Sequence, residues 1–516
     1  MHVTVFLLVS AIGMVYTDLF TAMVELEQLL ETESVLIRTL DDHISSTKLR
    51  LSQLRRQAAE YSKQFNEASV DVSTFLSNPI NAYQLVKRLA NDWKLTESLM
   101  VDSAEEERQQ MTQYRQQLKF PTVEDVVGAA TALMRLQDTY QLDTASIAQG
   151  QLNGVQYTTQ LSSDDCFELG RHSYNGQDYY HAELWMSESL KRHNHEQNSA
   201  NLRRWEILEY LAYSTYMQGK VQSALQLTDE LLAIIPTHQY ALSNRTLYQA
   251  AIGKAPQVDM DDLPGTGVYE MLCRKALSPS PQVLAHLKCR YVHKNDPFLR
   301  IGPLKEEDAY LDPRIVLYRD VIYEGEIEVM KKIASPRLER AQVGGHKGKP
   351  LVTNYRISKS CSLNEDEHPI IKRLSRRMEH ITSLTMDTAE PLQVINYGIG
   401  GYYFPHLDFS YDNSFADEDF GNRIATVLFY MSDVAQGGAT VFPSLELALW
   451  PEKGSAAFWY NLHPSGEGDL ATRHAACPVL TGSKWIASTW IHLYGQEFRR
   501  PCLLQKEVRN TTSWYS

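Results

Sequence analysis

Residues 393–408 read QVINYGIGGYYFPHLD, and this stretch decides the fold of the C-terminal half of the chain. It begins with a short apolar run typical of a β-strand, turns at glycines, and ends with His406-Leu407-Asp408. Side chains at positions i and i+2 of an extended chain share a face, so we expect His406 and Asp408 on one side. Further short alternating runs, punctuated by Gly and Pro, follow at 423–431, 439–442, 455–460 and 485–492. Strands at this spacing predict a β-barrel or β-sandwich.

The motif also predicts a metal site. His474 follows farther along the chain, and two histidines with one carboxylate form the ligand set of non-haem Fe(II) oxygenases. Such a set leaves positions open for oxygen and a bidentate co-substrate. His-x-Asp is weak by itself, because about one is expected by chance in a chain of this composition. Lys484 adds context, because it directly precedes the strand-like run 485–492. A cation at this position could bind the far carboxylate of 2-oxoglutarate through a charge-assisted hydrogen bond.

The N-terminal part of the chain predicts long helices. No Gly or Pro occurs between Met14 and Asn78, and alternating steps of four and three from Leu19 to Val72 fall almost entirely on apolar residues. This heptad pattern predicts a long helix in a coiled coil. The helix could pair with a second chain or fold back on the helix after Pro79. The sequence leaves both open, and self-association is the sharper hypothesis.

Residues 160–250 predict two helix-turn-helix units. Small residues and a proline recur at the spacing of tetratricopeptide repeats, at Gly170, Ala182, Ala212, Ala224 and Pro236. Such repeats form a concave groove for peptides. Tyrosines crowd this segment, and a row of tyrosines indicates a groove for a proline-rich, polyproline II ligand.

Composition limits the classes of function. The chain has 50 Lys and Arg against 63 Asp and Glu, a net charge of −13, which argues against nucleic acid as the main partner. Residues 1–17 hold an uncharged apolar run, which predicts a secretory signal peptide; no other stretch has transmembrane length. The soluble remainder is therefore expected in an oxidising lumen.

Six cysteines allow many disulfide pairings there. The plausible local bridges are Cys273 with Cys289 and Cys477 with Cys502, leaving Cys166 and Cys361 outside them. The sequon at Asn510, in the polar C-terminal tail, is the better candidate for glycosylation. The chain ends without an endoplasmic-reticulum retrieval tetrapeptide, so a partner would hold it in that compartment.

Three long runs carry a family resemblance. Residues 393–408, 423–443 (RIATVLFYMSDVAQGGATVFP) and 458–490 (FWYNLHPSGEGDLATRHAACPVLTGSKWIASTW) closely resemble the catalytic domain of collagen prolyl 4-hydroxylase alpha subunits. The resemblance continues upstream through LQDTY at 136–140, CFELG at 166–170, DYYH at 178–181 and ELWM at 183–186. It therefore spans nearly the whole chain.

The resemblance implies a multidomain α+β protein. Its parts are a signal peptide (1–17), a helical coiled-coil dimerisation region (18–140), a tetratricopeptide-type peptide-binding domain (141–250), a linker with a disulfide (251–310), a double-stranded β-helix, or jelly-roll, dioxygenase domain (311–500) and a tail (501–516). It also implies an α2β2 tetramer with protein disulfide isomerase as the β subunit, in the endoplasmic reticulum lumen. The implied substrates are procollagen or collagen-like proline-rich polypeptides.

The same resemblance assigns roles to residues. His406, Asp408 and His474 match the iron ligands, Lys484 the anchor for 2-oxoglutarate, and Tyr397 and Tyr430 tyrosines of the co-substrate pocket. Groove positions are matched by Tyr174, Tyr210, Tyr213 and Asn244. The implied cofactors are Fe(II), 2-oxoglutarate, O2 and ascorbate (vitamin C).

Two groove positions differ from what the family pattern leads one to expect, and two other functions are compatible with parts of the sequence. Tyr240 stands where vertebrate members commonly have Arg, and Asn244 lies in a sequon that we expect to be unmodified because a glycan would block the groove. One alternative function is an inactive scaffold that binds proline-rich peptides. Another is a 2-oxoglutarate oxygenase acting on another residue, such as lysine; the groove, and Lys rather than Arg as the anchor, argue against it.

Overall fold

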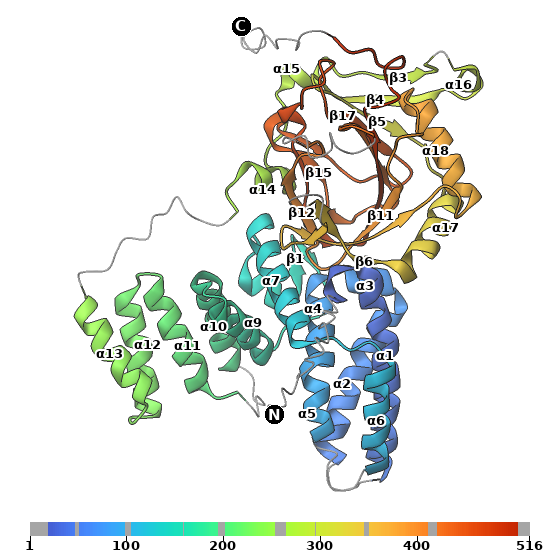
Figure 1. Ribbon diagram of the computed structural model, residues 1–516. Helices are drawn as coiled ribbons and strands as arrows, with labels where there is room; N and C mark the ends of the chain where they lie inside the picture. Colours follow the sequence, from blue (N-terminus) through green and yellow to red (C-terminus); the bar gives the residue numbers. More distant parts are fainter. Residues whose placement is uncertain are drawn as a thin grey trace, which may run out of the picture.

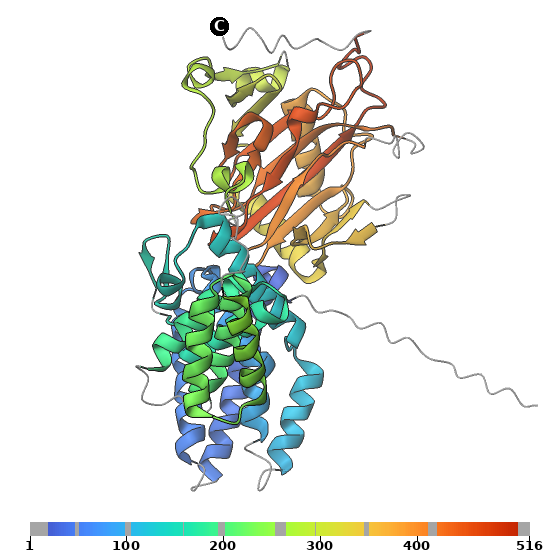
Figure 2. The ribbon, with the colours of Figure 1, turned by 90° about the vertical axis from the view of Figure 1, so that its left-hand side faces the viewer.

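The computed structural model describes residues 19–46, 51–98, 105–157, 159–194, 202–252, 265–294, 296–344, 350–410 and 420–503. The predicted signal peptide and the Asn510 sequon lie outside these ranges. A bundle of N-terminal helices lies below a β-rich domain, and a row of antiparallel helices lies beside the bundle (Figure 1). Figure 2, seen from the side of that row, shows it in front of the bundle with the β-rich domain above both.

The N-terminal bundle does not contain the single long helix that the heptad pattern predicts. Two helices that contact each other take its place, and they lie side by side in Figure 1. The helices of this part are α1 (Met23–Ser46), α2 (Leu51–Val70), α3 (Val72–Ser77), α4 (Pro79–Lys87), α5 (Trp93–Ser98), α6 (Glu105–Gln117), α7 (Val123–Tyr140) and α8 (Thr144–Ala148). Seam residues Leu26, Leu40 and Leu54 are buried within the chain. The prediction failed because a heptad pattern specifies an apolar stripe and not the partner that covers it.

Glu33 is the charged exception on this seam, and the structure explains it. Its carboxylate is fully buried and pairs through both oxygens with the guanidinium of Arg88, whose Nη2 donates at 2.9 Å. Arg88 begins a π-helical turn, Arg88–Asp92, between α4 and α5. Each of the two groups provides the opposite charge for the other, so neither charge is buried without a partner in the core of the bundle.

The helix row has the predicted repeat architecture. Its members are α9 (Ser163–Asn175), α10 (Tyr179–His193), α11 (Arg204–Met217), α12 (Val221–Ile234) and α13 (Gln239–Ala251). The small residues of the repeat pattern lie where helices approach closely: Ala182 and Ala224 are fully buried, and a Cβ on Gly170 would lie 2.9 Å from Met186 Cγ. Across the described residues, no helix is long and apolar enough to cross a bilayer.

The C-terminal domain consists of two antiparallel sheets. The nine-stranded sheet has the order β3 (Cys289–Val292), β4 (Leu304–Leu311), β5 (Arg314–Arg319), β17 (Ala456–Tyr460), β13 (Arg423–Tyr430), β20 (Lys484–His492), β11 (Leu392–Tyr397), β10 (Lys359–Leu363) and β6 (Glu339–Arg340). The five-stranded sheet has the order β16 (Leu447–Leu449), β15 (Thr440–Phe442), β18 (His474–Ala476), β12 (Tyr402–His406) and β9 (Arg356–Ile357). The predicted strands coincide with β11, β13, β15, β17 and β20 to within a residue at each end.

Shorter elements complete the structure and move one predicted boundary. They are three two-stranded ladders, β1 (Gln151–Leu152) with β2 (Val155–Gln156), β7 (Gln342–Gly344) with β8 (Pro350–Val352) and β14 (Gln436–Gly437) with β19 (Val479–Thr481), and the helices α14 (Val268–Cys273), α15 (Pro281–Leu284) and α16 (Pro297–Ile301). Because β3 pairs with β4 and β4 pairs with β5, the sheet already begins at Cys289. The prediction that the whole segment 251–310 is a linker is therefore wrong for its last part, which belongs to the sheet.

The two faces of the large sheet have different neighbours. Helices α17 (Glu324–Ala334) and α18 (Pro369–Thr382) pack on the outer face, where alternate strand residues such as Val316 and Phe429 join their apolar core. The inner face meets the small sheet, and Tyr397 and Leu428 pack there with Phe442. This alternation follows from the period of two along a strand and leaves the inner face for the functional site.

The structure overturns the predicted disulfides. Cys273 pairs with Cys477, with their Cα atoms 5.5 Å apart, whereas Cys289 and Cys502 are exposed and not in a disulfide. Proximity in sequence is misleading here, because α14 packs on β15 and β16 and so brings Cys273 beside the end of the neighbouring β18. Cys166 and Cys361 are buried outside the bridge.

Candidate active site

His406, Asp408 and His474 come together at the small sheet. Their ligand atoms all lie within 4.8 Å of one another, with Asp408 carboxylate oxygens 3.7 Å from His406 Nε2 and 3.6 Å from His474 Nε2. The two histidines are direct cross-strand neighbours on β12 and β18. Strand β12 ends at His406, so Asp408 approaches from the bend that follows rather than from an extended strand. The trio therefore presents two imidazoles and a carboxylate to one point.

Hydrogen bonds orient each of these side chains. Nδ1 of His406 lies 2.8 Å from the carbonyl of Phe404, and Nδ1 of His474 lies 3.0 Å from that of Thr472. A carbonyl can only accept, so each Nδ1 carries the proton and each Nε2 lone pair faces the common point. Asp408 Oδ2 accepts a 2.7 Å hydrogen bond from the hydroxyl of Thr426.

The electrostatics favour metal ligation. Burial and the neighbouring His474 lower the pKa of His406 to about 3, so its imidazole is neutral. Burial alone would raise the pKa of the Asp408 carboxyl, but the two imidazoles and Arg423 outweigh it and the pKa is lowered. An anionic Asp408 carboxylate beside a neutral His406 imidazole is the protonation state that binds a divalent cation.

Aromatic rings wall the trio. The ring of Tyr403 stacks on His406 with centroids 3.5 Å apart, and Trp459 meets His474 edge to face at 4.8 Å. Asn461, fully buried, donates to the Thr426 hydroxyl at 2.9 Å and so fixes the partner of Asp408. These contacts hold the ligands in place.

Lys484 is a buried cation on the inner face of the large sheet. Its side chain is 1% exposed, and Nζ has no hydrogen-bond partner among the described residues. Burial lowers the pKa of this amine to about 7. It lies opposite Tyr397 in the β11–β20 ladder and over that ring at 4.9 Å. An unpaired ammonium at such depth is costly unless an anion joins it.

The predicted pocket tyrosines share this face. Tyr397 and Tyr430 are buried with Lys484, and desolvation raises the pKa of both phenols, that of Tyr397 to about 12. The hydroxyl of Tyr430 is hydrogen-bonded to that of Thr440 at 2.9 Å. Ser488 follows Lys484 by four residues on β20 and so lies on the same face; its buried hydroxyl has no hydrogen-bond partner within the part of the chain that the structure describes.

Together these residues fit the groups that the sequence implies. Two nitrogens and one carboxylate oxygen match a ferrous ion that keeps open coordination positions. The unpartnered Lys484 ammonium and Ser488 hydroxyl match a small dicarboxylate such as 2-oxoglutarate. The ligand set and the buried polar atoms without hydrogen-bond partners thus fit Fe(II) and 2-oxoglutarate, respectively.

The N-terminal bundle braces this site from behind. The amides of Gly398 and Ile399 donate, each at 3.1 Å, to backbone carbonyls of the turn before α1. A Cβ on Gly398 would lie 2.0 Å from the Phe20 carbonyl, so only glycine permits this approach. Asn396 Oδ1 accepts from Val24 N at 3.2 Å, and its amide donates to the Lys484 carbonyl at 3.2 Å. Helix α1 is therefore linked to the strand that carries the buried lysine.

A second candidate site lies on the helix row. Tyr174, Tyr210 and Tyr213 form one cluster with centroid separations of 4.9 and 5.6 Å from Tyr174, and Tyr179 joins it at 5.6 Å. Tyr248 on α13 is fully buried. It stacks on Tyr216 of α11 at 4.4 Å. These tyrosines thus follow α9, α11 and α13 along the row, with α11 in contact with both of the other helices.

The structure does not join every predicted groove residue to the cluster. Asn244 is half-buried on α13, one turn before Tyr248 and therefore on the same face. Tyr240 is 73% exposed near His238, at the start of that helix. Sequence reasoning assigned no role to Tyr248, Thr426, Asn461 and Ser488, and it included Tyr179 only among the tyrosines that crowd the segment. Only the tyrosines carried a detectable signal, their density in the segment.

Comparisons with known proteins match the segments that carry both candidate sites. Family models match for the prolyl 4-hydroxylase alpha-subunit N-terminal region at residues 22–154, the prolyl 4-hydroxylase peptide-substrate-binding domain at 163–254 and the 2OG-Fe(II) oxygenase superfamily at 392–492. Prolyl 4-hydroxylase subunit alpha-2 of Caenorhabditis elegans is 45% identical over 96% of this chain and 95% of its own length. Subunit alpha-1 of Gallus gallus is 43% identical over 95% of this chain and 100% of its own.

Proposed function

We infer that this chain, which belongs to the family of prolyl 4-hydroxylase alpha subunits, hydroxylates proline in proline-rich polypeptides that its helix row binds. It is a 2-oxoglutarate- and Fe(II)-dependent dioxygenase. The observation that carries this conclusion is the convergence of His406, Asp408 and His474 in front of a sheet that also buries the unpartnered Lys484. A scaffold without catalysis would have no use for such a costly arrangement.

The residues of the chain divide the work between holding and positioning. His406, Asp408 and His474 would hold Fe(II), and Lys484 would hold the far carboxylate of 2-oxoglutarate. Once bound, the metal and 2-oxoglutarate supply the oxidation of the substrate by O2, with release of succinate and CO2. The buried walls exclude water, and Thr426 keeps the Asp408 carboxylate oriented.

We propose that the tyrosine groove recognises polyproline II segments of procollagen or collagen-like chains. Proline-rich segments dock on aromatic surfaces because their extended conformation is already ordered before binding. The cluster around Tyr174 offers ring edges and faces over several helices. Hydroxylation at C4 of proline in X-Pro-Gly repeats would follow when the bound chain reaches the iron site.

The remaining parts of the proposal concern partners and location. We propose that the chain enters the endoplasmic reticulum through the signal peptide at 1–17 and assembles with protein disulfide isomerase as an α2β2 tetramer. Ascorbate would keep the iron ferrous, and Asn510 would carry a glycan. The two facing sheets are proposed to be the double-stranded β-helix of this oxygenase class. What supports these statements is the family to which the chain belongs.

A hydroxylation assay tests the function. The chain, co-expressed with protein disulfide isomerase, is incubated with a (Pro-Pro-Gly)n peptide, Fe(II), 2-oxoglutarate and ascorbate. We expect peptide prolines to gain the mass of one oxygen atom and succinate to form in equal amount. His474→Ala should abolish both signals, whereas His286→Ala, an exposed control on α15's C-terminal side, should not. Full activity of a pure His474→Ala sample would contradict the ligand assignment.

A further inference from the structure

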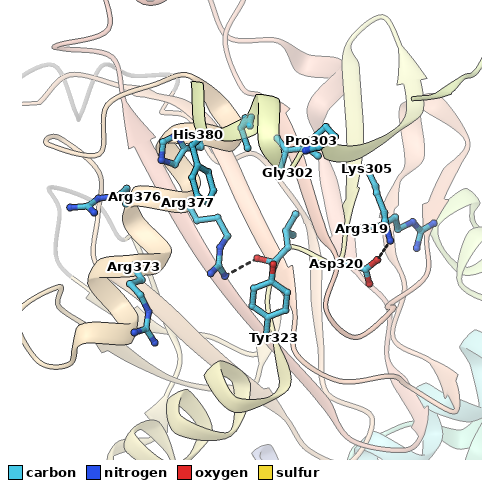
Figure 3. Close-up of a pocket in the computed structure, with 14 residues that line it drawn as sticks. Gly302, Pro303, Lys305, Arg319, Asp320, Tyr323, Arg373, Arg376, Arg377 and His380 are labelled. Atoms are coloured by element: carbon cyan, nitrogen blue, oxygen red, sulfur yellow. Dashed lines mark hydrogen bonds and ion pairs between the residues drawn. The ribbon is translucent and has the colours of Figure 1, made fainter. Parts of the chain in front are cut away.

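A basic groove lies on the outer side of the β-rich domain, where no role has yet been assigned. It has a volume of about 640 Å3 between α16, α18 and the end of the large sheet where β4 begins and β5 ends. In Figure 3, Arg373, Arg376 and Arg377 of α18 stand on one side, and Lys305, Arg319 and Asp320 stand on the other. Tyr323 lies between the two sides. The groove is therefore built from elements far apart in sequence.

The groove faces away from the iron site. On β5, Val316 and Tyr318 join the core under α17 and α18, whereas Ile315 and Leu317 face the core between the sheets. The lining residues Leu299, Leu304 and Val321 belong to the first of these cores. A ligand in the groove would thus be separated from the iron site by the thickness of the sheet, and catalysis and docking could proceed together.

The charges of the groove are only partly neutralised. Arg377 is paired with Glu326 at 2.7 Å, Lys305 with Asp320 at 2.5 Å, and Arg319 with Glu307 at 2.7 Å. His380 lies 2.7 Å from Asp296. Arg373 and Arg376 are exposed and have no ion pair with any residue in the described ranges. Three residues apart on α18, these two guanidiniums project from neighbouring positions of one helix face.

Aromatic rings accompany these cations. The side chains of Phe298 and Tyr323 are 67% and 58% exposed, which is unusual for rings beside an apolar floor. Phe298 stacks on His380 with centroids 5.6 Å apart, and Arg377 lies over the Tyr323 ring at 5.0 Å. The floor between them is made by the buried Leu299 and Val321. Such a combination offers a place for an apolar side chain with positive charge around it.

We propose that this groove docks an acidic segment of a partner polypeptide, whose aromatic or aliphatic residue inserts between Phe298 and Tyr323. Charge complementarity selects this occupant: the chain as a whole carries −13, yet this surface presents two unpaired arginines. Guanidinium groups bind carboxylates through two parallel hydrogen bonds, and rings beside them form the anchor that concentrates binding energy. An inorganic anion would use the arginines but leave the rings and the floor without a role.

The electrostatic part is tested by fluorescence anisotropy on the full-length chain in its active, partner-assembled form. The probe is a short fluorescent peptide in which glutamates flank one phenylalanine. Arg376→Glu should weaken binding by roughly three- to tenfold, because it replaces an attraction by a repulsion. Lys372→Glu is the matched control: it makes the same charge change on the same helix, at an exposed residue outside the groove. Equal losses in both variants would overturn the groove as the binding site.

The apolar part is tested in the same assay. Phe298→Ala should weaken binding by about tenfold, since it removes the ring against which the apolar residue of the ligand would be buried. Ile301→Ala, which truncates a 90% exposed apolar residue outside the groove, should change nothing. A peptide with alanine in place of phenylalanine should bind as weakly to the native chain as the original peptide binds to Phe298→Ala.

Two further outcomes would overturn the proposal. Displacement of the peptide by inorganic phosphate at equal concentration, with Phe298→Ala silent, would show a small-anion site. Sedimentation with anionic phospholipid vesicles that Arg376→Glu abolishes and Phe298→Ala does not would show a membrane-facing patch. Hydroxylation of a proline-rich peptide should be unchanged in both groove variants, which shows that each is folded and keeps this test separate from that of the catalytic function.

Discussion

Replacement of Lys484 by methionine should stabilise the ligand-free protein while removing its ability to hold 2-oxoglutarate. The amine is 1% exposed and unpaired among the described residues, and burial lowers its pKa from 10.5 to about 7. A difference of about 3.5 pKa units corresponds to about 5 kcal/mol of unfavourable burial of the charge. Local relaxation reduces this upper bound, so we expect a gain of about 1–4 kcal/mol, the range found when buried charges give way to apolar groups of similar size.

The pH dependence of this gain has a definite sign. The folded state holds the amine proton more weakly than the unfolded state does, because the pKa falls from 10.5 to about 7 on folding. The penalty of the buried charge is therefore complete below pH 7 and disappears as the pH rises toward 10.5. The difference in melting temperature between Lys484→Met and the native chain should shrink over this interval. In the native enzyme the KM for 2-oxoglutarate should rise above pH 7, where the ammonium is lost.

Thermal unfolding without and with 2-oxoglutarate measures both effects. At pH 7 we expect Lys484→Met to melt several degrees higher than the native chain, and only the native chain to be stabilised further by 2-oxoglutarate. Lys372→Met, on an exposed lysine, is the control for the loss of charge. The KM for 2-oxoglutarate should rise at least about thirtyfold, as for a buried charged contact. A lower melting temperature for ligand-free Lys484→Met would refute the reasoning.

Three further predictions follow from the buried contacts. Arg88→Met should lower the stability of the bundle by about 3–5 kcal/mol, because it leaves the Glu33 carboxylate buried without its partner. Adding Glu33→Leu to this variant should restore most of the lost stability. Chemical denaturation followed by circular dichroism checks both. Asn396→Ala, which cuts the link between α1 and β20, should raise the KM for 2-oxoglutarate more than the KM for peptide, and equal changes would contradict a positioning role. Tyr213→Ala should raise the KM for a proline-rich peptide about tenfold with kcat unchanged, and steady-state kinetics would contradict it if kcat fell instead.

The residues that the sequence identified are those whose chemistry imposes a spacing. His406 and Asp408 are two positions apart on or beside one strand, and Lys484 begins a strand, so strand periodicity made them candidates and the family resemblance gave them roles. Thr426 and Asn461 were not candidates, because a buried hydroxyl or amide on a strand has no characteristic spacing. Their role depends on which strands become neighbours.

Long-range partners account for the errors as well. The heptad pattern correctly predicted which face of α1 and α2 is buried. It did not predict the partner, because another helix of the same chain or a helix of a second chain can cover the same apolar stripe. Loop-closure arguments favour short disulfides, yet the Cys273–Cys477 bridge closes a separation of 204 residues. The basic groove was equally hidden, because a run of arginines on one helix is usually a solvated face until strands from elsewhere complete it.

These contacts make the N-terminal helices part of the catalytic scaffold rather than an appendage. The segment 398–401 connects the strand of Tyr397 to the strand of His406, and the turn before α1 accepts hydrogen bonds from two of its amides. Arg135 of α7 donates to the Gly400 carbonyl at 3.2 Å, and its guanidinium lies 4.1 Å from the centroid of the Tyr402 ring. A catalytic domain cut free of the bundle would exchange these hydrogen bonds for hydrogen bonds to water, at a net cost of about 0.5–1.5 kcal/mol each. The positions of β12, which carries His406, and of β11, which carries Tyr397, therefore depend on how the N-terminal helices are packed. Any assembly that shifts α1 should shift both strands.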